Sequence, residues 1–172
     1  MNKILLSLCI VSTFATGSVW AAGESAQNAT SETYMITGLH CPACTKTIEA
    51  SLSKTPGIQS IKVDWKTKDA KIAFDESKVS AQQVAQLIAA TPHMMGPSMH
   101  YDGWLVLKTP DMKDDASAAK AKDALQKVAG VKSVNPFSDK HLVEIQFTAD
   151  GKTNSQQLID ALSAAGLKAE QF

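Results

Sequence analysis

The chain contains an internal repeat, and this repeat limits the folds open to its 172 residues more than any other feature. At an offset of 73 residues, TPGIQSIKV aligns with VAGVKSVNP, and the Ile-x-Phe of KIAF aligns with that of VEIQF. One inserted residue later, AQQVAQLIAATPH aligns with SQQLIDALSAAGL. We therefore expect two copies of one supersecondary unit, each about 70 residues long.

Both copies have the same order of predicted elements: strand, helix, two strands, helix and a final short strand. Apolar residues recur at helical spacing, as at Val84, Leu87 and Ile88, and alternate as in half-buried strands, as at Ile72 and Phe74. This βαββαβ order predicts an α+β fold of two tandem ferredoxin-like domains. The predicted strands are 34–38, 58–63, 70–74, 104–108, 131–135 and 142–147, and the predicted helices are 43–54, 81–90, 116–128 and 155–165.

The first 21 residues have the composition of a cleaved export signal. Lys3 supplies a positive charge, residues 4–19 are mostly apolar, and Val19-Trp20-Ala21 fits the small-residue rule for signal peptidase. A membrane anchor is the competing interpretation, but the stretch is broken by Ser, Thr and Gly and is short of the roughly 20 apolar residues that a span needs. We expect a periplasmic protein that begins at Ala22 and is not inserted in the membrane.

Three segments are expected after cleavage. Residues 22–32, AGESAQNATSE, are small and polar and predict a flexible leader. The first copy then occupies 33–101 and the second 102–172, with a very short linker at about 101–103. A linker of this length favours copies that pack against each other, and a monomer is expected.

Removal of Cys9 with the signal leaves two cysteines, Cys41 and Cys44, within TGLHCPACTKTIEA. A single pair that closes a four-residue ring removes little entropy from the unfolded chain, so a structural disulfide is not expected. Two thiols between a strand and the start of a helix can converge on one ion, and a helix N-terminus favours thiolates. Thiolates select soft ions, and two sulfurs suit linear or trigonal coordination better than four-coordinate structural zinc. The predicted order of preference is Cu(I), then Hg(II), then Zn(II) or Cd(II).

With GLHCPAC (38–44) between its first strand and first helix, the segment 33–101 resembles the heavy-metal-associated domain family. This family includes copper chaperones, N-terminal modules of copper ATPases and periplasmic mercury-binding proteins. IEASL follows where the family usually has Ile-Glu-x-x-Leu. Leu39 stands in place of the usual methionine, whose family role is core packing, and His40 replaces a small polar residue. The resemblance implies a non-enzymatic chaperone or scavenger that exchanges one ion with a donor or acceptor protein.

CPAC also resembles the active-site pair of thiol-disulfide oxidoreductases, and an exported protein meets an oxidising compartment. Those enzymes have a thioredoxin fold, typically with an aromatic residue before the first cysteine. Here His40 takes that place, and each repeat is too short for that fold. Metal binding is the favoured interpretation, and disulfide exchange stays open as the alternative.

The second copy lacks the cysteines. The repeat offset carries Cys41 onto Asp114 and Cys44 onto Ser117, neither of which is a soft-metal ligand. We expect a degenerate copy kept for folding, docking or spacing, with a hard-metal site at Asp111, Asp114 and Asp115 as the less favoured reading.

Further ligands are available near the cysteines. TPHMMGPSMHYDG (91–103) contains His93 at the turn that lies beside the metal loop in the resembled family, so His93 is a candidate third ligand or hydrogen-bond partner of a thiolate. Met94 and His40 are further candidates, because thioether and imidazole groups both bind copper. Core packing is the competing role of the methionines.

The charge composition argues against one class of partner. The 17 basic residues are all lysines and are balanced by 17 acidic residues. The bidentate guanidinium that favours phosphate recognition is therefore absent, and nucleic-acid binding is not expected.

Overall fold

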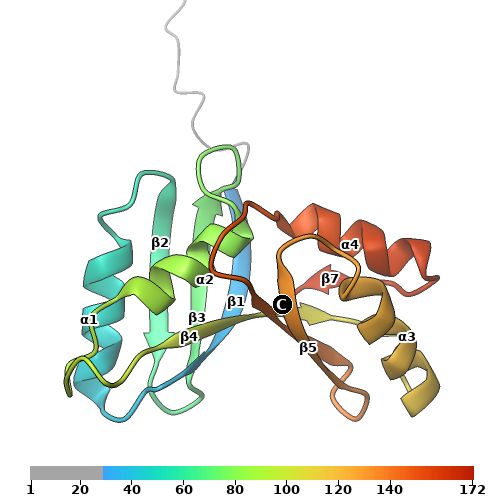
Figure 1. Cartoon of the computed structure of the whole chain (residues 1–172), viewed down its shortest axis with the longest axis horizontal. Coiled ribbons are helices and arrows are strands. Elements are labelled where there is room, and N and C mark those ends of the chain that lie inside the picture. The colour runs from blue at the N-terminus through green and yellow to red at the C-terminus, as the bar shows by residue number, and fades with distance from the viewer. Residues whose placement is uncertain (1–28) are drawn as a thin grey trace, which may run out of the picture.

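The computed structural model describes residues 29–172, in which seven strands form one continuous sheet (Figure 1). The strands lie in the order β2-β3-β1-β4-β6-β5, and the short β7 also pairs with β4. The elements are β1 (Ala29–Thr37), α1 (Pro42–Leu52), β2 (Ile58–Asp64), β3 (Asp69–Asp75), α2 (Ala81–Ala90), β4 (Asp102–Lys108), α3 (Asp115–Leu125), β5 (Val131–Phe137), β6 (Leu142–Phe147), α4 (Ser155–Ala164) and β7 (Glu170–Gln171).

The two ferredoxin-like units are confirmed, and they share a strand. β4 is the last strand of the first unit, where residues 102–106 pair with β1. It is also the first strand of the second unit, where residues 105–108 pair with β6 and residues 107–108 pair with β7. The sequence predicted a separate final strand in the first copy, and this detail is wrong because residues 91–101 form a loop. One strand can serve both units because a strand has a hydrogen-bonding edge on each side.

One face of the sheet is buried across both units. Tyr34 lies directly opposite Leu105, which lies opposite Ile145, and directly opposed side chains point to the same face. All three are fully buried. They belong to one hydrophobic core that also contains the apolar residues of the four helices, among them Ile48, Val84, Leu125 and Leu158.

Strand β1 begins earlier than the sequence indicated. Residues 29–32, expected in the flexible leader, pair with residues 72–75 of β3. Thr30 and Thr33 suit a strand because β-branched residues favour extended backbone. The remainder of the expected leader, 22–28, and the expected signal peptide lie outside the described residues.

Gln82 of α2 joins the two units. Its side chain is fully buried; Nε2 donates to the Asp150 carbonyl at 2.8 Å, and Oε1 accepts from the Thr153 N–H at 3.0 Å. A Cβ at Gly130 or Gly151 would lie 2.4 or 2.6 Å from Oε1 of this glutamine. Glycine is therefore required at both positions for the second unit to close around Gln82.

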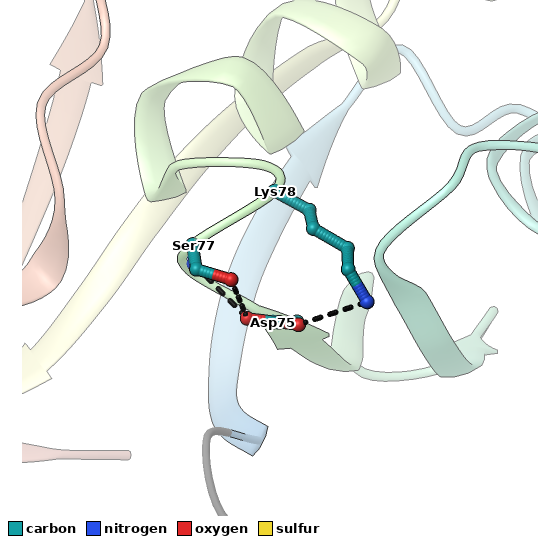
Figure 2. Close-up of polar contacts among 3 residues, drawn as sticks. All are labelled: Asp75, Ser77 and Lys78. Carbon is teal, nitrogen blue, oxygen red and sulfur yellow. Dashed lines mark hydrogen bonds and ion pairs between the residues drawn. The ribbon is translucent and has the colours of Figure 1, made fainter. Parts of the chain in front are cut away.

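A tight turn after β3 adds a second link between the units. Figure 2 shows the contacts that form the turn: Asp75 accepts hydrogen bonds from the N–H and Oγ of Ser77, at 3.0 and 2.6 Å, and pairs with Lys78 at 3.1 Å. Within this turn, Oε1 of Glu76 accepts hydrogen bonds from the N–H and Oγ of Ser155, both at 2.8 Å. The Glu76 carboxylate therefore lies at the N-terminus of α4, where negative charge is favoured.

Glu32 of β1 lies at the junction between the two units, near Glu76 and Ser155, and is fully buried. Neither of its carboxylate oxygens has a hydrogen-bond partner. Burial raises the pKa of Glu32 to about 7; the Glu76 charge adds to the rise, and the side chains of Ser155 and Gln171 offset part of it. The junction therefore contains a carboxyl group that holds its proton far more tightly than a solvated one.

Candidate metal centre

The two cysteines lie at the start of α1 as free thiols. Cys41 is the N-cap residue, with the extended backbone typical of that position, and Cys44 is the third residue of the helix. Their sulfurs are 3.0 Å apart, and the Cys44 N–H donates to the Cys41 carbonyl at 3.1 Å. Cys41 is partly exposed whereas Cys44 is buried, so an incoming ion meets Cys41 first.

Helix α1 differs from the other three helices in how it begins. The N-terminal residues of α2, α3 and α4 form reciprocal capping boxes, by Ser80 with Gln83, Asp114 with Ser117, and Asn154 with Gln157. In α1 the N-cap side chain makes no capping hydrogen bond, and its first turn holds no acidic residue. The partial positive charge at the N-terminus of α1 is therefore available to stabilise negative charge on the two sulfurs.

In the second copy, capping residues occupy the positions that align with the two cysteines. Cys41 corresponds to Asp114 and Cys44 to Ser117, as the sequence predicted, and these two residues form the capping box of α3. The Ser117 N–H donates to Asp114 Oδ1 at 2.8 Å, and the Ser117 hydroxyl lowers the pKa of the Asp114 carboxyl. The same two helix positions thus hold a structural cap in one copy and a thiol pair in the other.

The Cys44 thiol is acidified. Burial by itself raises its pKa, but interactions with the Cys41 thiol, with the Tyr101 hydroxyl and with the backbone of His40 and Cys41 outweigh burial and lower the pKa to about 7. An ordinary cysteine is mostly protonated at neutral pH, so this shift increases the share of thiolate at Cys44. The thiolate is the form of cysteine that binds soft ions.

Tyr101 is the site residue that sequence reasoning missed. It directly precedes β4 and is fully buried. The Tyr101 hydroxyl is buried and makes no hydrogen bond in the structure. Burial, followed by its interaction with the Cys44 thiol, raises the pKa of Tyr101 to about 12, so the phenol keeps its proton and is available to donate it to a Cys44 thiolate. No local motif marks a tyrosine so far along the chain, and the repeat alignment offers no counterpart for it.

His93 connects its own loop to the cysteine loop. Its Nε2 lies 2.9 Å from the Gly38 carbonyl, and the Met95 N–H donates to Nδ1 at 3.1 Å. Nδ1 therefore has no proton, and Nε2–H is the donor to Gly38. The ring packs on Tyr101 with centroids 4.5 Å apart. Metal ligation by His93 would require one of these two hydrogen bonds to break.

The other candidates lie around the pair. The exposed His40 has its ring 5.7 Å from that of His93, measured between centroids. Met94 is 56 % exposed and lines a shallow groove beside α1 together with Ala43 and Lys46. Leu39 is buried in the core, as the family resemblance implied.

Gly38 allows the two loops to approach. It has a φ of +83°, and a Cβ there would lie 2.3 Å from the His100 carbonyl oxygen. In residues 29–172, the surroundings of Cys41 and Cys44 included, no group of three or more His, Cys, Asp and Glu side chains comes together as a metal cluster. His40 and His93 therefore do not complete a cluster with the cysteines, and the less favoured hard-metal site at Asp111, Asp114 and Asp115 gains no support.

Two ferredoxin-like units on one sheet, with a dithiol at an uncapped helix N-terminus, are features of a heavy-metal-binding protein. The model of the heavy-metal-associated domain matches residues 33–93 and 106–168, and the chain belongs to this family. Both copies are matched, so the second is a true family domain that lacks the cysteines.

The relatives handle different metals. The chain is 31 % identical over 86 residues to the mercuric transport protein periplasmic component of Serratia marcescens, which covers 50 % of this chain and 86 % of the relative. It is 37 % identical over 57 residues to copper-transporting ATPase 2 of Mus musculus, covering 33 % of this chain and 4 % of the relative. The family relationship therefore establishes a heavy metal without selecting one.

Among solved structures, the water-soluble region of the P-type ATPase CopA from Bacillus subtilis aligns over 83 % of this chain and 91 % of its own, with a TM-score of 0.41 and 18 % identity. Oxidized MerP from Ralstonia metallidurans aligns over 45 % of this chain and 96 % of its own, with a TM-score of 0.38 and 26 % identity. In the part of the chain that the structure describes, no helix has the length and apolar character to cross a bilayer.

Proposed function

We propose that this protein binds one soft metal ion between Cys41 and Cys44 in the periplasm, with Cu(I) as the first choice, and sequesters it or passes it to another protein. The observation that carries the proposal is the thiol pair itself, with sulfurs 3.0 Å apart at an uncapped helix start and a Cys44 pKa of about 7. Hg(II) is the second candidate, and Zn(II) is less favoured because two ligands leave its tetrahedral shell incomplete.

The sulfurs must separate to accept an ion. Metal–sulfur bonds of about 2.3 Å place two sulfurs roughly 4.6 Å apart across a linear ion. The present separation of 3.0 Å therefore has to increase by about 1.6 Å. Cys41 is the sulfur free to move, because it is partly exposed and ends the loop, whereas Cys44 is buried in the first turn of α1.

Transfer would proceed by ligand exchange. An incoming thiolate or thioether adds to the bound ion and forms a three-coordinate intermediate, after which Cys41 or Cys44 leaves. No covalent bond of the protein is made or broken, and the ion keeps its oxidation state. Tyr101 supports this step by stabilising the thiolate of Cys44 when the ion departs.

One observation supports Cu(I) ahead of Hg(II). Thioether side chains, which favour Cu(I), lie in the loop that packs on the cysteine loop. Copper-transporting ATPases are among the relatives but do not decide between the two ions. Mercuric transport proteins match over most of their own length, and this keeps Hg(II) as the named alternative.

The test is an anaerobic Cu(I) titration of the reduced protein against a chromophoric Cu(I) chelator of known affinity, with Hg(II) titrated in parallel. Withdrawal of one equivalent of Cu(I) is expected, and Cys41→Ser or Cys44→Ser should abolish it while the circular dichroism spectrum stays unchanged. Thr45→Ser, in the same helical turn, is the control that should retain binding. Tight Hg(II) binding without Cu(I) withdrawal would replace copper by mercury, and full affinity in either cysteine variant would refute the site.

A further inference from the structure

The loop between α2 and β4 carries soft ligands that the cysteine pair does not use. Met94, Met95, Met99 and His100 lie within seven consecutive residues. We propose that these four side chains, here called the methionine cluster, form a second site for a soft monovalent ion, Cu(I) or Ag(I), beside the cysteines. The proposal rests on the proposed function only in its choice of ion.

Core packing does not explain the cluster. Met94 is 56 % exposed and Met95 is 61 % exposed, and among residues 29–172 the only other large hydrophobic side chain with such exposure is Phe172. Met112, by contrast, is fully buried and fills the core as methionine usually does. Two adjacent apolar side chains in water at a metal-binding edge require a different explanation.

The backbone of the loop places the four residues in two consecutive turns. The Gly96 N–H donates to the His93 carbonyl, and the Met99 N–H donates to the Gly96 carbonyl, both at 3.2 Å. The chain therefore folds back twice within a few residues, with Met94 and Met95 at the centre of the first turn. Gly96 joins the turns with a φ of +119°, a conformation that other residues rarely adopt.

Both ends of the cluster are attached to the cysteine loop. At one end, the His93 ring accepts from the Met95 N–H and donates to the Gly38 carbonyl. At the other end, the His100 carbonyl packs against Gly38 so closely that a Cβ would lie 2.3 Å away. Both ends of the cluster therefore lie against the loop that leads to the partly exposed Cys41.

The ligand chemistry selects the ion. Thioethers are neutral and soft, and they favour Cu(I) and comparable ions over Zn(II), Mg(II) or Ca(II). They do not form disulfides, so the cluster keeps its affinity when the cysteine pair is oxidised. His100 is available as a fourth ligand because its side chain is 72 % exposed, with Nε2 3.6 Å from Asp102. The cluster would thus collect the ion and release it to the stronger thiolate pair by ligand exchange.

Silver provides the test because Ag(I) is soft and does not change oxidation state. The full chain with Cys9, Cys41 and Cys44 replaced by serine is labelled at the methionine methyl groups and titrated with Ag(I) in nuclear magnetic resonance experiments. Saturable shifts are expected at Met94, Met95 and Met99. Zn(II) should cause no such shifts, and the methyl signals of Met35 and Met112 should stay in place as internal controls.

A second variant separates binding by the methionine cluster from binding by Cys41 and Cys44. Met94→Leu/Met95→Leu/Met99→Leu, with all cysteines kept, should still withdraw one equivalent of Cu(I) from the chelator. When the same three substitutions are added to the cysteine-free chain, Ag(I) binding should weaken at least about tenfold, a loss of roughly 1.4 kcal/mol. Absence of shifts at the three methionines, or equal shifts at Met35, would overturn the proposal. If the wild-type protein binds Ag(I) at the three methionines but no Cu(I) at Cys41 and Cys44, only the proposed function is refuted.

Discussion

Replacing Glu32 by glutamine should stabilise the protein at neutral and alkaline pH. In the structure this carboxyl group is fully buried, and neither oxygen accepts a hydrogen bond. The neighbouring Glu76 already takes both hydrogen bonds that Ser155 donates. Glutamine has nearly the same shape as protonated glutamate and removes the cost of ionisation in a buried site.

The size of this change in the free energy of unfolding follows from the pKa of Glu32. Burial raises the pKa of Glu32 from 4.5 to about 7, and each pKa unit corresponds to about 1.4 kcal/mol. Because the folded pKa is above the unfolded one, the folded state holds a proton that the unfolded chain releases between about pH 4.5 and pH 7. Stability therefore falls as the pH rises through this window, by about 3 kcal/mol in total, and then levels off for this group.

The assay is urea unfolding followed by circular dichroism at a series of pH values. At pH 8 Glu32→Gln should raise the free energy of unfolding by up to about 3 kcal/mol, and at pH 4 it should have little effect. Glu170→Gln, exposed in β7, is the matched control and should change neither value. A Glu32→Gln protein that is less stable at pH 8, or that keeps the wild-type pH profile, would refute this account of the junction.

Three further substitutions test the site and the link between the units. Cys41→Asp combined with Cys44→Ser installs the capping pair of the second copy, so thermal unfolding should show about 1 kcal/mol of added stability while Cu(I) binding is lost; unchanged stability would contradict the capping argument. Tyr101→Phe removes the hydroxyl that lowers the pKa of Cys44, so the thiolate should form above about pH 7 and alkylation at neutral pH should slow; an unaltered rate–pH profile would exclude that role. Gln82→Ala leaves buried groups of the second unit without hydrogen-bond partners, so the free energy of unfolding in urea should fall by about 3 kcal/mol. Gln86→Ala, at a less buried position of the same helix, is the control. Equal effects of the two substitutions would refute the role of Gln82 in joining the units.

The fold was predictable because the repeat and the periodic apolar residues report local structure directly. The cysteine pair was predictable for the same reason, since Cys41 and Cys44 are close in sequence and lie where a strand gives way to a helix. Helices α2 and α4 begin at Ser80 and Asn154, residue types that favour the N-cap position, so these helix starts also depend on local sequence.

What the sequence missed depends on contacts between distant segments. Tyr101 meets Cys44 only after α2 and the following loop return the chain to the first loop. By its sequence, Glu32 is predicted to lie in a polar leader. In the structure it pairs with β3 and is buried near Ser155 and Gln171 of the second unit. The shared strand was missed because two aligned copies suggest two complete sets of strands, and nothing local shows that β4 is used on both edges.

Because β4 is shared, the copy that lacks the cysteines also supports the structure around the thiol pair. Tyr101, which helps to acidify Cys44, is the residue immediately before β4, and strands of the second unit flank β4 on both edges: β6 along residues 105–108 on one edge and β7 along residues 107–108 on the other. A chain cut at residue 101 would leave the first unit without its edge strand and Tyr101 without an anchor. The two copies therefore share one sheet, in which the copy without cysteines helps to position a residue that lowers the pKa of Cys44 in its neighbour.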